Sequence, residues 1–331
     1  MGRELIDDYP QYSVAMCTYN GEKYIGEQLY SILEQTIIPA EIVISDDGSN
    51  DQTLYIAREI LASNDIKFSI IQNQGEHGIR GNFYNAIRAC KEPIIFTCDQ
   101  DDVWLSHKAA TILPYFAEQK TMLVFTDGEL VNHMLESLGT TIWKANGVTD
   151  RFLTEKDWMT YLYSNMIVTG ATMAIRASLM DGIQSFPEGW PHDAFLAVKA
   201  AALDGIVACN QQLILYRQHE SNTLGMREID RRTHIQQWIK KSKNLVNDRK
   251  GRYERFRVLY NALESSFSDS EKKRMLRFLY FLKDLADCSD QPPYTQIPCI
   301  LKHYRNGDFN EFYDGKKTAL HSIIAAYLSR S

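Results

Sequence analysis

Cysteine pairs at metal-ligand or redox spacing are missing from this sequence. Its six cysteines are scattered without a CxxC pair, and Cys17 and Cys98 lie inside apolar runs, where Cys behaves as a small hydrophobic residue. The sequence therefore predicts neither a zinc site nor a disulfide framework.

Long apolar stretches and a basic excess are also absent. Nowhere do about 18 uncharged apolar residues run together, and the N-terminal MGRELIDDYPQYS has no apolar signal core. The net charge of -6 argues against nucleic-acid binding by bulk electrostatics, although it leaves local basic patches open. With 331 residues, 44% hydrophobic and 24% charged, the chain suits one large or two medium globular domains. We expect a cytoplasmic protein with no nucleic-acid partner.

Phosphate-binding glycine motifs are missing too. Neither GxGxxG nor GxxxxGK[ST] follows the first apolar run, which excludes the dinucleotide-binding and P-loop motifs. Short β-branched runs alternate instead with segments whose apolar residues recur at three and four. Strands are predicted at 12–17, 41–45, 67–72, 93–98 and 122–126, and helices at 23–35, 53–63, 81–90 and 107–119. Right-handed crossovers then give an α/β domain whose mostly parallel sheet is covered on both faces.

An acidic cluster, CDQDDVW at 98–104, directly follows one of the predicted strands. Its aspartates are Asp99, Asp101 and Asp102. Clustered carboxylates raise each other's pKa unless a cation neutralises them, and oxygen ligands suit Mg²⁺ or Mn²⁺ bound together with a substrate phosphate. An acidic turn before a helix N-terminus is the alternative, but three aspartates in four positions favour a metal site.

Polar residues follow the first two predicted strands as well. Thr18, Tyr19 and Asn20 come after the first strand, and Asp46 and Asp47 come after the second. A carboxylate there can accept the ring N–H of a pyrimidine base, and Tyr19 offers a stacking face. The following SND (49–51) is explained as well by a turn with a helix cap.

These segments resemble family 2 inverting glycosyltransferases of the GT-A fold, a Rossmann-like nucleotide-diphospho-sugar transferase fold, and more narrowly the rhamnosyltransferase-like group that builds bacterial surface polysaccharides. The matching segments are TYNGEKYIGEQLYSILEQ (18–35), ISDDGSNDQT (44–53), GNF (81–83), FTCDQDDVW (96–104), LVFTD (123–127), NMIVTGATMAI (165–175), PHDAFLAV (191–198) and YRQHESNTLG (216–225). Each is weak alone, but eight matches in order make chance resemblance implausible.

The resemblance implies a donor site and a metal site. The base and ribose of a UDP- or dTDP-sugar would be held by Thr18, Tyr19, Asn20, Asp46 and Asp47. Asp101 would be the principal ligand for Mn²⁺ or Mg²⁺, and Asp99 would reach the ribose or a metal-bound water. The metal would stabilise the charge that grows on the leaving nucleotide.

Asp193 stands where the family carries its catalytic carboxylate, and would deprotonate the acceptor hydroxyl as it attacks the anomeric carbon. A helix N-cap after Pro191 is the alternative. For His192 three roles stay open: orienting Asp193, touching the acceptor, or filling the core.

The resemblance also extends the pocket. Thr169, Gly170 and Ala171 would form its floor, where Gly170 allows close backbone approach, with a plain strand-turn as the alternative, and Trp104 would line it. His219 would be a further metal ligand and Arg217 a phosphate partner, with an ordinary surface loop as the alternative.

The donor sugar stays open, because the chain departs from the family pattern at two places. Ala194 and Phe195 stand where the family usually has a tryptophan pair, and Glu220 stands where it often has glycine. Rhamnose from dTDP-rhamnose and a hexose or N-acetylhexosamine from a UDP-sugar both remain candidates.

After residue 225 the composition changes to basic, helical patterns. We expect a GT-A domain at 1–225 and a helical extension at 226–331, with late helices near 270–286, 296–305 and 316–329 and a linker at 289–294. The basic residues Arg227, Arg231, Arg232, Lys240, Lys241, Lys243, Arg249, Lys250 and Arg252 would rest on anionic lipid at the inner face of the membrane, or form a solvated helical face. A homodimer is left open.

The sequence therefore predicts an inverting, metal-dependent glycosyltransferase that adds a sugar to a glycan or lipid-linked glycan in bacterial surface polysaccharide synthesis. Two alternatives stay open. One is a non-catalytic nucleotide-sugar or carbohydrate-binding subunit of a glycan assembly system. The other is a nucleotidyltransferase, which would release pyrophosphate.

Overall fold

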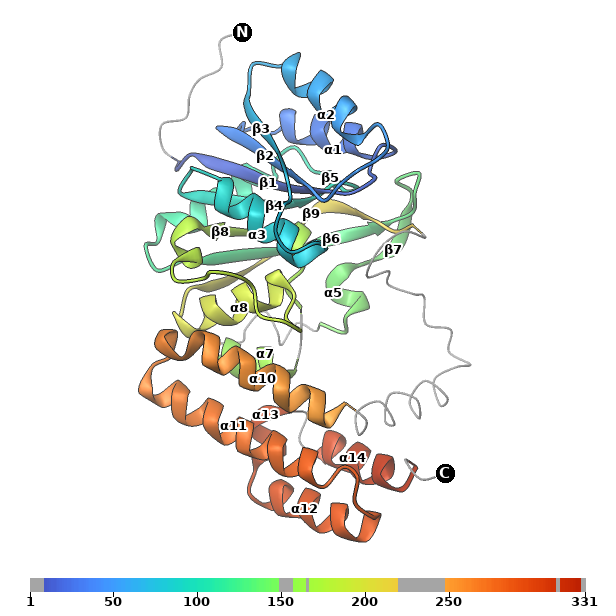
Figure 1. Ribbon diagram of the computed structural model, residues 1–331, viewed down its shortest axis with the longest axis vertical. Coiled ribbons are helices and arrows are strands. Elements are labelled where there is room, and N and C mark those ends of the chain that lie inside the picture. The colour runs from blue at the N-terminus through green and yellow to red at the C-terminus, as the bar shows by residue number, and fades with distance from the viewer. Residues whose placement is uncertain (1–8, 149–156, 165–166, 220–247, 314–315, 329–331) are drawn as a thin grey trace. The chain divides into compact units, whose positions relative to one another are not determined.

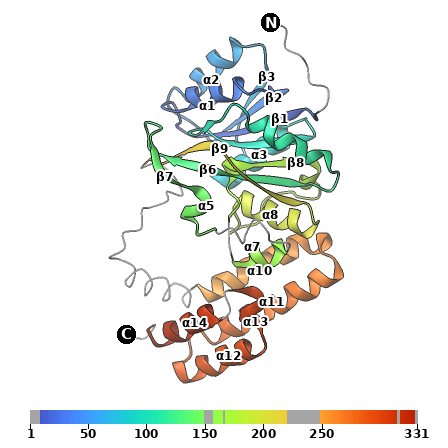
Figure 2. The same ribbon diagram turned by 180° about the vertical axis from the view of Figure 1, so that it is seen from behind.

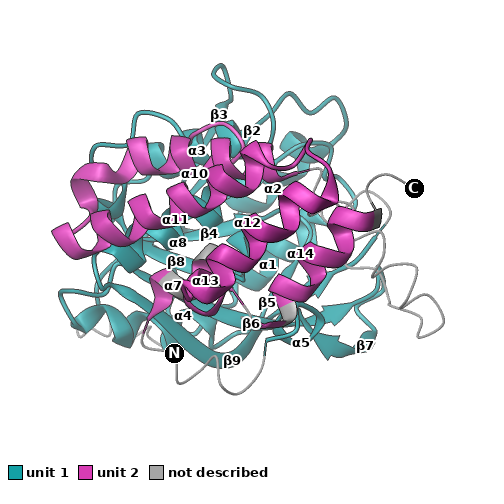
Figure 3. Ribbon diagram, turned by 90° about the horizontal axis from the view of Figure 1, so that it is seen from below, with its two compact units in different colours: residues 1–156, 166–186, 191–226 teal, residues 157–165, 187–190, 227–331 magenta. Residues whose placement is uncertain are grey.

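A computed structural model describes residues 9–148, 157–164, 167–219, 248–313 and 316–328 (Figure 1). The chain forms two compact units, coloured separately in Figure 3. The first contains residues 1–156, 166–186 and 191–226, and the second contains residues 157–165, 187–190 and 227–331. Short segments from the middle of the chain thus join the late helices in the second unit.

The first unit is built on a nine-stranded sheet with the order β3-β2-β1-β4-β8-β6-β9-β5, and β7 pairs with β6. Its strands are β1 (Tyr12–Thr18), β2 (Glu41–Asp46), β3 (Lys67–Gln72), β4 (Ile94–Asp99), β5 (Val103–Trp104), β6 (Leu123–Val131), β7 (Ser137–Thr141), β8 (Met173–Arg176) and β9 (Ile206–Arg217). The α/β class with a mostly parallel sheet is confirmed. The five predicted strands are β1, β2, β3, β4 and β6, and their ends differ by one residue at most except that β6 continues to Val131.

Helices of this unit cover both faces of the sheet. They are α1 (Ile25–Leu33), α2 (Thr53–Ala62), α3 (Ile79–Ala89), α4 (Lys108–Ile112), α5 (Ile142–Ala145) and α8 (His192–Ala202). The order β3-β2-β1-β4 reverses direction after β3, so right-handed crossovers put α1 and α2 on one face and α3 on the other. Figures 1 and 2 show this arrangement from opposite sides.

One predicted helix is shorter than expected. The segment 107–119 forms α4 and then a 3-10 helix, Leu113–Ala117. Pro114 lies at the start of that second helix, because it has no N–H to continue the hydrogen bonds of α4.

The core explains the composition of the parallel strands. All seven residues of β1 and all six residues of β2 are buried. Strands covered on both faces carry continuous apolar runs rather than alternation. The edge strand β3 shows instead exposed positions along its length.

The helical unit contains α7 (Trp158–Ser164), α10 (Arg249–Leu263), α11 (Asp269–Asp287), α12 (Pro293–Arg305), α13 (Asp308–Phe312) and α14 (Lys316–Leu328). A capping box between Ser268 and Glu271 starts α11. Its buried phenylalanine rings are those of Phe256, Phe267, Phe278, Phe281, Phe309 and Phe312. The three predicted late helices are α11, α12 and α14, and the predicted linker at 289–294 already enters α12 at Pro293.

The basic stretch predicted to face lipid lies mainly outside the described residues, with Arg227, Arg231, Arg232, Lys240, Lys241 and Lys243 among those omitted. Arg249 is buried and donates to Gln296 Oε1 over 3.0 Å, so this residue does not belong to a lipid-facing surface. Lys250 pairs with Asp290, and Arg252 lies over the rings of Phe256 and Tyr313. Within the part of the chain that the structure describes, no helix is both long and apolar enough to cross a membrane.

Candidate functional site

The carboxyl ends of β1, β2 and β4 meet at one edge of the sheet. These strands are parallel neighbours, and their register pairs Cys17 with Asp99 and Thr18 with Asp46. The switch in strand order falls between β1 and β4, which is where open α/β sheets bind their ligands. The polar residues that follow each strand in the sequence therefore come together here.

Asp46 holds the two loops at this edge in shape. Its carboxylate is buried and accepts hydrogen bonds from the Thr18 hydroxyl at 2.7 Å and from the backbone N–H groups of Gly48 and Ser49 at 3.0 and 2.8 Å. Asn20 adopts a left-handed backbone, φ 49°, and its side chain accepts from the N–H of Asn50. The polar side-chain atoms of Thr18, Asn20 and Asp46 thus form hydrogen bonds that hold these two loops in shape.

Tyr19 and Asp47 both reach solvent, unlike the buried Thr18 and Asp46. Tyr19 is 57% exposed. The Asp47 carboxylate accepts from the Gly78 N–H at 2.7 Å and Asn73 Nδ2 at 2.8 Å, and lies 2.9 Å from His77 Nδ1. Burial alone raises the pKa of Asp47, but these hydrogen bonds outweigh it and lower the pKa below the ordinary value. Asp47 is therefore an oriented carboxylate that stays ionised.

Gln100, which stands between Asp99 and Asp101, has a role that sequence reasoning missed. Its side-chain amide accepts from the Tyr19 N–H and donates to the Tyr19 carbonyl, both at 2.9 Å. A Cβ on Gly21 would lie 2.1 Å from Gln100 Oε1, so a larger residue at this position would displace the amide. Gln100 thus clamps the backbone of the loop that carries Tyr19, and an isolated glutamine offers no signal of such a contact.

Asp101 and His219 form the second part of the site. The carboxylate Oδ2 of Asp101 lies 2.9 Å from His219 Nε2, and the His219 ring stacks on Tyr24 with a centroid distance of 4.9 Å. These two residues are 118 positions apart and meet because β5 pairs with β9, with Val103 opposite Leu215. An oxygen and a nitrogen ligand therefore face each other at the edge of the sheet.

The remaining acidic residues are close enough to influence one another. Burial, followed by the charges of Asp101 and Asp193, raises the pKa of Asp99 to about 7. Burial, followed by Asp101 and Asp99, raises the pKa of Asp102 well above its ordinary value. Asp102 is buried and accepts from the backbone N–H of Arg217 at 3.0 Å, so it supports the acidic turn from beneath.

Asp193 lies half-buried in the first turn of α8. Its Oδ2 accepts from the Gly170 N–H at 3.0 Å, and its Oδ1 accepts from the Ala194 N–H at 2.7 Å. Both oxygens are therefore oriented by backbone groups. Each carboxylate oxygen keeps a further lone pair, so the side chain can still accept a proton.

His192 lies beneath Gly170 rather than in an open pocket. It is buried and stacks on Phe83 at a centroid distance of 3.9 Å. Neither ring nitrogen has a hydrogen-bond partner among the described residues, so no hydrogen bond from His192 orients Asp193. Burial lowers the pKa of His192, although the charge of Asp193 opposes this effect. The structure thus favours the interpretation of His192 as a neutral core residue.

Trp104 and Arg217 are corrections to the predicted pocket. Trp104 is 3% exposed and packs on Phe96, so it belongs to the core. The Arg217 side chain is 1% exposed, pairs with Glu27 and donates to the carbonyls of Asp101 and His133 at 2.8 and 2.6 Å. The guanidinium thus supports the acidic turn from inside the protein, and Arg217 is the last residue of β9 rather than part of an ordinary surface loop.

Tyr216 was not predicted as a site residue. Burial, followed by the charges of Asp99, Asp102, Asp101 and Asp193, raises the pKa of its phenol. The phenol therefore stays protonated. Its position at the end of the apolar run QLILY, directly before Arg217, carries no such signal.

Comparison with known proteins identifies the family. The sequence profile of glycosyl transferase family 2 matches residues 13–182, just over half of the chain. The chain belongs to glycosyltransferase family 2. The predicted family and the assignment as a glycosyltransferase enzyme are therefore confirmed.

Two relatives show how far the similarity extends. This glycosyltransferase is 42% identical over 97 residues to the dTDP-rhamnosyl transferase RfbG of Shigella flexneri, an alignment that covers 28% of this chain and 34% of RfbG. It is 24% identical over 221 residues to the UDP-Glc:alpha-D-GlcNAc-diphosphoundecaprenol beta-1,3-glucosyltransferase WfgD of Escherichia coli, covering 66% of this chain and 80% of WfgD. The chain thus spans about a third of the length of RfbG.

Solved structures of similar shape confirm the GT-A class. The crystal structure of S. aureus TarS 1–349 in complex with UDP-GlcNAc matches with a TM-score of 0.61 at 18% identity, covering 97% of this chain and 91% of TarS 1–349. The mannosyltransferase PcManGT of Pyrobaculum calidifontis, in complex with GDP-Man and Mn²⁺, matches with a TM-score of 0.52 at 16% identity, covering 98% and 87%. At these identities the similarity concerns the fold.

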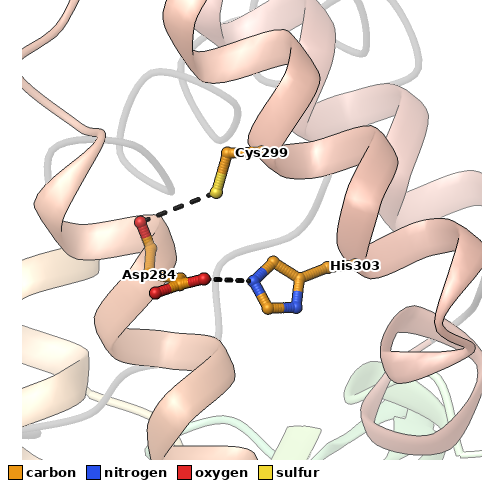
Figure 4. A group of neighbouring side chains, drawn as sticks. All are labelled: Asp284, Cys299 and His303. Atoms are coloured by element: carbon orange, nitrogen blue, oxygen red, sulfur yellow. Dashed lines mark hydrogen bonds and ion pairs between the residues drawn. The ribbon is translucent and has the colours of Figure 1, made fainter.

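A group of side chains of the types that can ligate a metal lies in the helical unit, where Asp284 of α11 faces Cys299 and His303 of α12 (Figure 4). The His303 ring sits between two carboxylates, with Nδ1 2.6 Å from Asp308 and Nε2 3.1 Å from Asp284. Lys302 Nζ donates to the same Asp284 oxygen at 2.8 Å. Because these charges balance one another, we interpret the group as an ion-pair network that joins α11, α12 and α13.

Proposed function

We propose that this glycosyltransferase transfers a sugar from a UDP- or dTDP-linked donor to a hydroxyl group of a glycan acceptor, with inversion at the anomeric carbon. The observation that carries the proposal is the gathering of acidic side chains at one edge of the sheet: Asp99 ends β4, Asp101 meets His219 at 2.9 Å, and Asp193 is near enough to raise the pKa of Asp99. Carboxylates gathered in this way suit a site that must bind a cation and also accept a proton.

The donor half of the site would bind the nucleotide. Asp47 is an ionised acceptor for the ring N–H of a uracil or thymine base, and the exposed ring of Tyr19 offers a stacking face. The names of two relatives, a dTDP-rhamnosyl transferase and a UDP-Glc glucosyltransferase, support the same two donor classes. Thr18, Asn20 and Asp46 would contribute by keeping the loops in shape.

A divalent cation fits the pair formed by Asp101 and His219. Asp101 Oδ2 and His219 Nε2 lie 2.9 Å apart, a distance at which two ligands can bind the same ion. The nearby carboxylates would be stabilised by the positive charge of that ion. An imidazole ligand favours Mn²⁺ over Mg²⁺, which takes oxygen ligands. When bound, the metal would stabilise the negative charge of the nucleoside diphosphate leaving group. PcManGT, of the same fold, is described with Mn²⁺.

Asp193 would act as the base. The acceptor oxygen forms a bond to the anomeric carbon, the bond from that carbon to the phosphate oxygen breaks, and its electron pair leaves with the nucleoside diphosphate. The acceptor proton passes to Asp193, whose two backbone hydrogen bonds fix the direction of the carboxylate. Attack on the face opposite the leaving group inverts the configuration.

The rest of the chain would serve the acceptor. We assign the donor chemistry to residues 1–225 and treat residues 226–331 as a helical extension that helps to approach a lipid-linked glycan at the inner face of the membrane. WfgD, whose name contains a diphosphoundecaprenol-linked acceptor, supports this class of acceptor. The product would then be a bacterial surface polysaccharide.

The test combines a donor panel with an Asp193→Asn variant. Calorimetry with UDP-glucose, UDP-N-acetylglucosamine and dTDP-rhamnose, with and without Mn²⁺, identifies the donor, and release of free nucleoside diphosphate then measures turnover. We expect metal-dependent binding of one donor, and in Asp193→Asn the same binding with turnover at least roughly 1000-fold lower, because a general base and its orientation are both lost.

Asp204→Asn is the matched control. Asp204 is exposed and has a left-handed backbone, φ 51°, that asparagine adopts equally well, so this variant should keep full turnover. Normal turnover in Asp193→Asn contradicts the base assignment. Donor binding without any transfer or hydrolysis by the wild-type chain supports instead a non-catalytic binding subunit.

A further inference from the structure

Lys108 is a buried lysine next to the acidic site. Its side chain is 0% exposed, its ammonium lies 4.1 Å from the centroid of the Trp104 ring, and Nζ donates to the carbonyl of Ala171 at 2.8 Å. Burial of an ammonium group is costly unless it is compensated by hydrogen bonds and nearby negative charge. Such a residue therefore has to be explained by what it contacts.

The Ala171 carbonyl belongs to the 3-10 turn Gly170–Thr172, which is held from two sides. On one side its carbonyls accept hydrogen bonds, from the Thr97 hydroxyl to Gly170 and from Lys108 to Ala171. On the other side the Gly170 N–H donates to Asp193 Oδ2. The position of this short turn therefore sets the position of the donor that orients Asp193.

Two carboxylates of the acidic turn act on the ammonium. Burial lowers the pKa of Lys108 to about 8, and the nearby carboxylates of Asp102 and Asp99 oppose this effect. The lysine is therefore mainly protonated at neutral pH, and it supplies positive charge on the protein side of a group of carboxylates. A neutral side chain of the same size would fill the space but would provide neither the charge nor the N–H donors.

We infer that Lys108 is a positioning residue for sugar transfer, which anchors the Gly170–Thr172 turn through the Ala171 carbonyl and thereby holds the Gly170 N–H against Asp193. The inference rests on the proposed role of Asp193 as the base. Lys108 itself does not contact Asp193, and it acts through two backbone groups of one turn.

The chain offers a matched control for a purely structural role. Lys199 of α8 is also buried, and its ammonium donates to two backbone carbonyls, those of Leu179 at 2.8 Å and Asp181 at 2.6 Å. These carbonyls belong to a different turn, and among the described residues no hydrogen bond joins that turn to Asp193. Lys199→Met thus removes the same kind of interaction as Lys108→Met without touching the Gly170–Thr172 turn.

The test measures turnover, donor binding and local hydrogen exchange in full-length Lys108→Met, Lys199→Met and Asp193→Asn. Hydrolysis of UDP-glucose and dTDP-rhamnose reports turnover without a known acceptor, and calorimetry with UDP and dTDP reports binding. In Lys108→Met we expect turnover to fall roughly 10- to 100-fold with binding unchanged within about twofold, because misplacement of a catalytic group lowers kcat and leaves uniform binding intact. Exchange of the amides in 167–173 should become faster.

Lys199→Met should keep turnover and the exchange rates of 167–173, even where it lowers Tm. Equal turnover in Lys108→Met and Lys199→Met overturns the inference, and so does unchanged exchange in 167–173. If Asp193→Asn turns over normally, the proposed base is wrong, and a slow Lys108→Met cannot then act through it. If both Lys108→Met and the smaller polar variant Lys108→Gln fail to fold while Lys199→Met folds, Lys108 is a stability residue and the inference is overturned.

Discussion

Gly170→Ala should disturb the site through a single methyl group. A Cβ at Gly170 would lie 2.6 Å from Nε2 and 2.9 Å from Cε1 of His192. The imidazole cannot easily withdraw, because it is buried and stacked on Phe83. Either the ring or the turn has to move, and the turn carries the N–H that holds Asp193.

The size of the effect follows from the cost of overpacking. Forcing an extra methyl into a packed core costs about 1–3 kcal/mol. With a slope of roughly 2 kcal/mol per molar urea, the unfolding midpoint should fall by about 0.5–1.5 M. Turnover should also decrease, since a shift of about 1 Å at a catalytic group can cost up to 100-fold.

The measurement is urea unfolding followed by circular dichroism, together with nucleoside diphosphate release. Gly26→Ala is the control, because a Cβ there meets only Ile60 Cδ1 at 3.7 Å and Ile56 Cγ2 at 3.9 Å. Gly26 lies in α1, where alanine should stabilise by about 0.5–1 kcal/mol. The opposite signs of the two substitutions separate a steric effect from a general effect of glycine replacement.

A double variant tests the cause. In Gly170→Ala/His192→Ala the imidazole is gone, so the methyl group added at position 170 has space and should not destabilise the protein further. The summed changes in the free energy of unfolding of the two single variants should therefore differ from the change in the double variant by about 1–3 kcal/mol. Additive effects, or a Gly170→Ala protein as stable as Gly26→Ala, would refute the steric explanation.

Two further substitutions test the donor loop and the helical unit. Gln100→Ala removes both hydrogen bonds to the Tyr19 backbone, so calorimetry with UDP and dTDP should show binding weaker by about 3- to 10-fold. The control Gln119→Ala, at an exposed position, should bind both nucleotides as the wild type does. Equal affinities of Gln100→Ala and the wild type would contradict the role of Gln100 as a clamp. In the helical unit, burial raises the pKa of Asp284, but hydrogen bonds from Lys302 and His303 outweigh it and lower the pKa. The ionised Asp284 therefore contributes stability above the pKa of unfolded Asp, and this contribution is lost as the pH falls through the folded pKa. Below about pH 4, the Tm of Asp284→Asn should therefore fall less steeply with pH than the Tm of the wild type. Identical pH slopes would exclude this role.

The parallel half of the sheet could be predicted because its signals are local. The apolar runs that became β1, β2 and β4 are bounded by polar clusters, and burial on both faces makes the runs continuous. The strand β8 and the antiparallel pairing of β5 with β9 were not predicted. Both depend on partners far along the chain, Phe96 with Ala174 and Trp104 with Ile214, for which periodicity contains no signal.

Within the site, residue type alone did not separate contact with a ligand from support of a loop. Asp46 and Asp47 are adjacent aspartates in one turn, yet the first is buried among loop N–H groups and the second reaches solvent. Arg217 offers the chemistry of a phosphate ligand but is enclosed by Glu27 and two carbonyls. Burial and hydrogen-bond partners decide such cases, and both are properties of the folded chain.

The sequence by itself determined that an α/β sheet would form and that acidic residues would follow its strands, since hydrophobic periodicity and turn chemistry act over a few neighbouring residues. Only the tertiary structure decided which of these residues meet. The pairing of β5 with β9 brings His219 to Asp101, and the turn at Gly170 connects Asp193 with Lys108 and Thr97. These contacts join residues more than 20 positions apart, and strand order and register, which result from packing of the whole sheet, place them together.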